Sequence, residues 1–161
     1  MDFEGGLENC LPRLRRFAFA LSRNAADADD LTQMTVERAL AAKRQWQPGT
    51  RLDSWLYRIM RNLWIDTARA RSRRAKLEAP PEAAEAVGID PRPGMEASID
   101  LQRIMAAMSR LPDEQREVVA LILIEGFGYR ESAEMLGVPI GTVSSRLVRG
   151  RTALLEMVGE R

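Results

Sequence analysis

The chain of 161 residues contains no histidine and a single cysteine, Cys10. Without histidine it cannot build the usual zinc sites or a His-dependent catalytic centre, and one cysteine cannot form an intrachain disulfide. No pairing of a nucleophile with a base is visible either. We therefore expect no bound metal, no cofactor and no enzymatic activity, and we interpret Cys10 as a packing residue of an apolar helix.

Long apolar runs are also missing. The longest, Val118 to Ile124, spans seven residues, whereas a membrane helix needs about 20. The N-terminus is acidic and carries no signal-peptide pattern. These absences predict a cytoplasmic protein without membrane insertion. A hydrophobic content of 45% with 29% charged residues is ordinary for a globular fold.

The net charge of +1 conceals a segregated distribution of charge. Residues 43–76 hold 10 basic and 2 acidic residues, while residues 1–42 hold 5 basic and 7 acidic ones. Residues 77–100 hold 1 basic and 6 acidic residues, and residues 101–161 hold 8 of each. This order is typical of an acidic surface, a nucleic-acid footprint, an acidic linker and a balanced second domain.

Apolar spacing predicts an all-α first domain over residues 1–76. Leucine and phenylalanine recur at steps of three and four from Leu7 to Ser22, which predicts an amphipathic helix. A second helix begins with the acidic cluster Asp27 to Asp30, at the positive end of its dipole, and buries Val36, Ala39 and Leu40. A third, long helix follows the turn Trp46 to Gly49 and extends to about Arg74.

The third predicted helix combines basic and aromatic side chains. Arginines can follow a phosphate backbone while aromatic rings stack on unpaired bases, a combination that fits single-stranded or melting DNA. The alternative is that the rings are core and the arginines are merely solvated. The residues concerned are Arg51, Arg58, Arg61, Arg69 and Arg73, with Trp46, Trp55, Tyr57 and Trp64 among them. We favour a core position for Trp55 and a functional one for Trp46, in the loop.

Residues 77–100 read as a flexible linker, because four prolines, alanines and glutamates cannot bury enough apolar surface to fold alone. Residues 101–161 then predict a compact four-helix unit. Its last two helices, within Tyr129 to Arg151, are separated by Gly137 and Pro139. Val143 and Leu147 recur at i, i+4 as the buried stripe of the final helix. This pattern predicts a helix-turn-helix, a motif that places its second helix in the major groove of DNA.

Several motifs along the chain together resemble bacterial RNA polymerase sigma factors of the extracytoplasmic-function (ECF) group. The resemblance covers nearly the whole chain, in the same order. It is carried by Asp29-Asp30-Leu31-Thr32-Gln33, Trp55 to Asn62, Leu111-Pro112 with Glu114 to Val118, Glu125-Gly126-Phe127, and Leu136 to Val143 with Ser145-Arg146-Leu147.

This resemblance implies a specificity subunit that binds core RNA polymerase through the β′ clamp and the β flap. The first domain would open the minus-ten promoter element and the second would read the minus-thirty-five element, under the control of an anti-sigma factor. The polymerase-binding positions would be Asp30, Gln33, Met34 and Glu37, although the family commonly has an acid where Met34 stands. The loop Trp46 to Arg51 and the adjacent Asn62 would receive an unpaired base. The downstream set is then Trp46, Arg51, Arg58, Arg61, Asn62, Arg69 and Arg73. The upstream set is Thr142, Ser144, Ser145, Arg146, Val148, Arg149 and Arg151.

Two other classes of protein remain open at this point. A helix-turn-helix repressor would account for the second domain, but it leaves the basic aromatic helix and the linker without a role. A sigma-factor mimic that captures an inhibitor would share the fold, yet such mimics usually carry a switch domain. Run-off transcription with core polymerase distinguishes them, because only an initiation factor turns transcription on.

Overall fold

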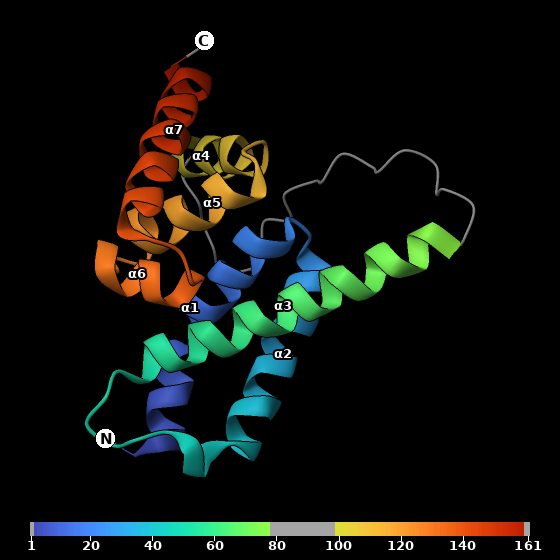
Figure 1. Cartoon of the computed structure of the whole chain (residues 1–161), viewed down its shortest axis with the longest axis vertical. Coiled ribbons are helices and arrows are strands. Elements are labelled where there is room, and N and C mark those ends of the chain that lie inside the picture. The colour runs from blue at the N-terminus through green and yellow to red at the C-terminus, as the bar shows by residue number, and fades with distance from the viewer. Residues whose placement is uncertain (1, 78–98, 160–161) are drawn as a thin grey trace.

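A computed structural model describes residues 2–77 and 99–159, and every regular element within these ranges is a helix (Figure 1). The predicted all-α class is therefore confirmed. The elements are α1 (Phe3–Ser22), α2 (Ala25–Ala41), the 3-10 turn η1 (Lys43–Gln45), α3 (Leu52–Leu77), α4 (Ile99–Ser109), α5 (Asp113–Val119), the π-helical segment η2 (Ala120–Ile124), α6 (Tyr129–Leu136) and α7 (Ile140–Gly159).

Side-chain caps set the limits of the first two helices. The Asp2 carboxylate accepts a hydrogen bond from the Gly5 amide at 2.8 Å, so α1 begins earlier than the apolar spacing from Leu7 predicts. Arg23 ends α1 in the left-handed region, at φ 57°. Asn24 then caps α2 by accepting from the Asp27 amide at 3.0 Å. The chain therefore reverses direction within two residues.

Helices α1, α2 and α3 pack together around aliphatic and aromatic side chains. Leu14, Leu31, Leu56 and Met60 are all at most 2% exposed. The expectation for Leu40 is wrong, because its side chain is 46% exposed. Apart from Leu31, the buried face of α2 uses small residues, which let α1 and α3 approach closely: Ala28, Thr32, Thr35 and Ala39. The two threonine hydroxyls are satisfied by carbonyls of their own helix.

The second half contains the predicted helix pair, α6 and α7. Gly137 ends α6 at φ 67°, a conformation that costs glycine little. Val143 is fully buried and Leu147 is 6% exposed, as the i, i+4 stripe predicts. Helix α7 packs against α4, α5 and α6 (Figure 1).

Gly150 lies in the middle of α7, where glycine normally weakens a helix. A Cβ atom at this position would lie 2.8 Å from Val119 Cγ2 and 3.3 Å from the Gln115 Cβ of α5. Gly150→Ala is therefore expected to lower the free energy of unfolding by about 1–3 kcal/mol, through overpacking. Gly141→Ala is the matched control, since nothing lies within 4 Å of its Cβ position. Urea denaturation measures both, and equal stabilities would contradict the close contact between α5 and α7.

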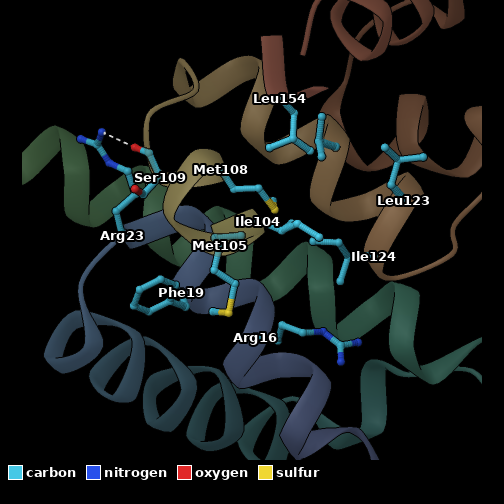
Figure 2. A pocket seen from close by; sticks show the side chains of 12 residues that line it. Arg16, Phe19, Arg23, Ile104, Met105, Met108, Ser109, Leu123, Ile124 and Leu154 are labelled. Carbon is cyan, nitrogen blue, oxygen red and sulfur yellow. Dashed lines mark hydrogen bonds between the residues drawn. The ribbon is translucent and has the colours of Figure 1, made fainter. Parts of the chain in front are cut away.

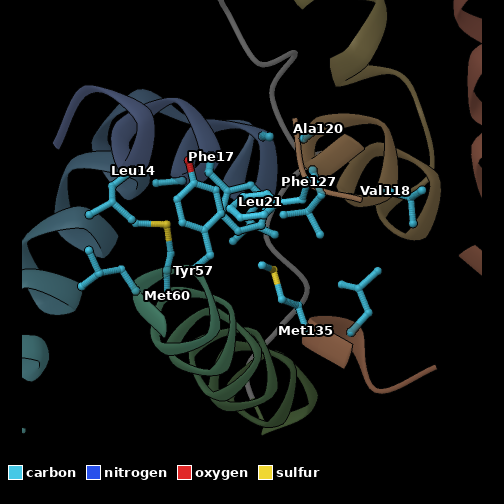
Figure 3. Close-up of a cluster of buried hydrophobic side chains, with 14 of the residues drawn as sticks. Leu14, Phe17, Leu21, Tyr57, Met60, Val118, Ala120, Phe127 and Met135 are labelled. Atoms are coloured by element: carbon cyan, nitrogen blue, oxygen red, sulfur yellow. The ribbon is translucent and has the colours of Figure 1, made fainter. Parts of the chain in front are cut away.

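The two halves of the chain pack against each other through one continuous core. Phe17 of α1 and Tyr57 of α3 meet Phe127 and Met135 of the second half (Figure 3). Tyr57 and Phe127 have ring centroids 5.0 Å apart in an edge-to-face arrangement. The predicted linker falls mainly on residues 78–98, which lie outside the described residues. At its margins α3 extends to Leu77, and α4 begins at Ile99.

Candidate nucleic-acid and polymerase interface

The outer face of α7 presents most of the residues predicted to read the upstream box. Val148 is 64% exposed, and Ser145, Arg149 and Arg151 are exposed as well. Thr142 and Ser144 are half-buried nearer the start of the helix. A short polar stripe followed by arginines can donate hydrogen bonds to base edges and phosphates in a major groove.

Arg146 differs from the other arginines of α7. Its guanidinium turns toward α5 and lies 3.6 Å from the Glu114 carboxylate, with only 21% of the side chain exposed. Arg146 is therefore a partly buried bridge between α7 and α5 in this conformation, whereas the family resemblance implies a contact with upstream DNA.

Three of the predicted downstream-box arginines are paired with acids of the second half. Arg51 donates to both Glu131 oxygens at 2.8 Å. Arg61 makes a bidentate pair with Glu117 at 3.0 and 3.2 Å. Arg58 lies 3.5 Å from Glu134. Three arginines at the start of α3 and just before it thus face acidic side chains of the second half.

The other downstream residues have different surroundings. Asn62, Arg69 and Arg73 are exposed on α3. Trp46 is half-buried after η1, where its ring lies 5.8 Å from that of Phe3. Its buried indole nitrogen has no hydrogen-bond partner within the described part of the chain. Trp46 therefore packs against α1 and forms one wall of the loop.

Tyr57 is not available for stacking on a base. Only 1% of the residue is exposed, and its ring stacks on Phe17 with centroids 4.8 Å apart. The expectation that Tyr57 offers an open aromatic face is therefore wrong. Trp55, half-buried and in edge contact with Phe3, is closer to the core role expected for it.

Glu125 is the centre of the contact between the halves. Its side chain is 1% exposed and accepts the Tyr57 hydroxyl at 2.8 Å. Arg16 donates to both Glu125 oxygens, at 2.7 and 2.8 Å, and the Arg13 Nε lies 3.5 Å away. The hydrogen bond to Glu125 raises the pKa of Arg16. A buried carboxylate with several charge-assisted partners resists separation, because removing a partner leaves charge unpaired.

Local backbone geometry places Glu125 and Phe127 on the same side of the molecule. The wider turns of η2 end with the Glu125 amide bonded to the Ala120 carbonyl at 2.9 Å. Gly126 then adopts φ 79°, and the Phe127 amide bonds to the Leu121 carbonyl at 2.9 Å. Phe127 lies under the Arg51 guanidinium, whose carbon is 4.9 Å from the ring centroid.

Arg116 makes a second connection between the halves. Its guanidinium is buried, which lowers its pKa. It donates to the Ala20 and Leu21 carbonyls in the last turn of α1, as well as to Asp113 at 2.6 Å. Carbonyls at a helix end lack partners within the helix, so this arginine caps α1 from the other half.

The environment of Tyr57 predicts a loss of stability at alkaline pH. Burial, followed by the Glu125 charge, raises the pKa of Tyr57 far above its ordinary value of 10.0, and Arg13 and Arg16 oppose this only in part. Above about pH 10 the unfolded chain loses this proton while the folded chain keeps it, so stability falls by up to about 1.4 kcal/mol per pH unit.

Denaturant midpoints of the wild type and Tyr57→Phe between pH 9 and 11 test this effect. The variant starts less stable, because it lacks the hydrogen bond to Glu125, but its midpoint should fall less steeply with pH. Parallel pH profiles for the two proteins would contradict the assignment.

The predicted polymerase-binding residues share an open side of α2. Asp30, Gln33 and Glu37 are exposed, and Met34 is 40% exposed. Asp27, one turn earlier, forms a bidentate pair with Arg71 of α3 at 2.7 and 2.8 Å, which lowers the Asp27 pKa. The surface therefore combines acidic groups with one apolar side chain.

An apolar groove of about 430 Å³ runs between α1, α4, η2 and α7 (Figure 2). At one end Arg23 donates to the Ser109 carbonyl at 3.1 Å. Leu123, at the opposite side in the view, is 50% exposed. The apolar walls of the groove are formed by Phe19, Ala20, Ile104, Met105, Met108, Val119, Leu123, Ile124 and Leu154.

Sequence reasoning missed the acids that join the halves. Glu117, Glu125, Glu131 and Glu134 carry no pattern that distinguishes them from solvated acids. The available signals were Glu125-Gly126-Phe127 and the segment Glu114 to Val118, motifs of the resembled family to which no role was given.

Within residues 2–77 and 99–159, no helix is both long and apolar enough to cross a bilayer. Within the same ranges, no group of three or more Cys, Asp or Glu side chains is arranged to hold a metal ion.

Family models match both halves of the chain. The model of sigma-70 region 4 matches residues 101–154, and that of the sigma2 domain of PhyR matches residues 7–61. Among curated relatives, ECF RNA polymerase sigma factor EcfG of Rhodopseudomonas palustris is 39% identical over 89% of this chain and 78% of its own length. SigE of Mycolicibacterium smegmatis is 42% identical over 92% of this chain and 58% of its own.

Solved structures agree with the sequence relatives. Sigma factor RpoE from Bartonella quintana, crystallised with the anti-sigma factor NepR, matches with a TM-score of 0.87 at 34% identity over 99% of both chains. CnrH, in complex with the cytosolic domain of CnrY, matches with a TM-score of 0.63 at 25% identity, over 95% of this chain and 87% of its own. The chain belongs to the ECF family of RNA polymerase sigma factors.

Proposed function

We propose that this sigma factor binds core RNA polymerase, opens the minus-ten element with its first half and reads the minus-thirty-five element with its second. The proposal rests on one observation: each half of the chain carries a surface suited to binding DNA, and the two surfaces differ in chemistry. One is the basic face of α3 beside the Trp46 loop, and the other is the polar stripe of α7. The division into domains 1–76 and 101–161 joined by a linker belongs to the same proposal.

Promoter opening without ATP requires interactions made only with the separated strands. Unstacking a base costs a few kcal/mol, which stacking and phosphate contacts with the open strand can offset. The Trp46 loop, Asn62 and the α3 arginines supply donors and an aromatic wall for those contacts. The exposed side chain of Asn62 lies one turn from Arg58 along α3.

Asn62→Ala is expected to reduce promoter melting about tenfold or more while leaving polymerase binding intact, because amide contacts with an extruded base are lost only from the open complex. Permanganate reactivity of thymines in the minus-ten region measures melting. Arg15→Ala, an exposed position on α1, is the control and should melt DNA normally. Wild-type reactivity in Asn62→Ala would rule out a role in strand capture.

The α7 stripe would read an intact duplex. Arg149 is exposed beside Val148, and a guanidinium there can form a bidentate contact with guanine. The short side chains of Ser144 and Ser145 allow the helix to approach the bases more closely. Arg151 and Thr142 would bind phosphates. Arg146 joins them only if its bridge to Glu114 opens.

An anti-sigma factor would hold this sigma factor inactive. The support is the similarity to the sigma factor RpoE, crystallised with the anti-sigma factor NepR, and the apolar groove, which the segment from Val118 to Phe127 partly forms. An amphipathic helix of the inhibitor could insert apolar side chains beside Leu123 and Met105 (Figure 2).

A further inference from the structure

The acids of the second half occupy the positions that a nucleic-acid backbone would take on the first. Glu117, Glu131 and Glu134 each pair with one arginine along the α3 stripe, namely Arg61, Arg51 and Arg58. A carboxylate and a phosphate are recognised by the same guanidinium geometry. The arginines therefore cannot hold these acids and a DNA strand at the same time.

We propose that this sigma factor inhibits itself: the acidic row Glu117, Glu131 and Glu134 folds back on the first half and occupies Arg61, Arg51 and Arg58 of the strand-binding face until the halves separate. The inference rests on the proposed role of α3 in strand capture and adds a regulatory contact within the chain. In the same conformation the α7 stripe stays open, since Val148 is 64% exposed and Arg149 is exposed. The closed chain thus occupies three arginines of the strand-binding face, leaves Asn62, Arg69 and Arg73 exposed, and keeps the upstream-reading stripe accessible.

Two kinds of contact join the halves: a buried cluster around Glu125, called the latch, and the ion pairs of the acidic row with the arginines, called the mask. Glu125 is buried with Tyr57, Arg16 and Arg13 and holds the halves together. Two of the outer pairs are exposed, with side-chain exposures of 52% and 36% for Arg51 and Glu131 and of 49% and 61% for Arg58 and Glu134. The third, Arg61 with Glu117, is less exposed, at 19% and 13%. Exposed ion pairs contribute little to stability. Removing the three acids should therefore free Arg58 and Arg61 and leave Arg51 with only Asp53 of its own half, while the Glu125 cluster keeps the protein folded.

The test compares two triple variants with the same change in charge. The mask variant carries Glu117→Gln, Glu131→Gln and Glu134→Gln. The control carries Glu8→Gln, Asp100→Asn and Glu156→Gln, at exposed positions outside the contact and outside α3. Fluorescence anisotropy with a random 12-nucleotide single strand is expected to show about tenfold tighter binding for the mask variant and at most about threefold for the control. Equal gains would overturn the proposal, because the acids would then act only through net charge.

A distance measurement follows the conformation independently of DNA. Spin labels at Glu8→Cys and Thr152→Cys, both exposed positions, in a Cys10→Ala background should give one narrow distance distribution in the free protein. Replacing Glu125 by Gln in that protein should add longer distances. A broad, extended distribution in the wild type would overturn self-inhibition. Failure of every variant to support transcription with core polymerase would instead refute the proposed function and leave this distance result standing.

Discussion

Glu125→Ala is expected to lower the free energy of unfolding by about 3 kcal/mol and to loosen the contact between the two halves. The change removes the acceptor of a buried tyrosine hydroxyl and the partner of two arginines. Breaking a buried pair from one side costs about 3–5 kcal/mol, and the lower end applies because Arg16 is 43% exposed and can rehydrate. Urea denaturation followed by both tryptophan fluorescence and circular dichroism measures the loss.

Two controls separate burial from charge in this experiment. Glu134→Ala removes an exposed carboxylate of the same interface, 61% exposed, and should cost at most about 0.5 kcal/mol. Glu125→Gln keeps the volume and an acceptor for Tyr57, and should fall between the two. Equal losses for Glu125→Ala and Glu134→Ala would show that Glu125 is not the latch.

Asp30→Lys is expected to weaken binding to core polymerase about 100-fold with little change in folding stability. Asp30 is exposed on α2 among the residues predicted to dock. Reversing a charge within a complementary interface places like charges together, which costs several kcal/mol in the complex and little in the free protein. Biolayer interferometry with immobilised core polymerase measures the affinity.

Glu8→Lys, the same reversal at an exposed position of α1, is the matched control and should bind normally. Met34→Ala removes the apolar part of the same surface and should weaken binding less than Asp30→Lys. If Asp30→Lys and Glu8→Lys bind core polymerase equally well, α2 is not the docking helix.

Local patterns were sufficient to predict the helices, because capping, periodicity and turn chemistry act over a few residues. The stripe of Val143 and Leu147 predicted the buried face of α7, and Gly137 predicted the end of α6. Boundaries moved where a cap lay outside the apolar repeat, as Asp2 does for α1. Leu40 was misplaced because α2 buries small residues, which a hydrophobicity pattern underweights.

Contacts between the halves could not be predicted, because they depend on how the two halves fold together. Glu125 bonds to Tyr57, 68 positions away, and to Arg16, 109 positions away. The sequence pattern therefore grouped Tyr57 with the aromatic residues among the arginines, although its side chain lies in the core. The arginines of α3 were correctly found as a basic stripe, but nothing local showed that acids of the second half cover three of them. The need for glycine at position 150 likewise follows only from its close contact with Val119.

The most direct test of the account is transcription of fragmented host genomic DNA by purified core polymerase, with and without this chain, followed by mapping of the RNA 5′ ends. We expect new start sites that appear only with the chain and share two upstream sequence boxes at a constant spacing, one for each half of the molecule. An absence of chain-dependent start sites, or start sites that share only one box, would contradict promoter recognition by two halves of one sigma factor.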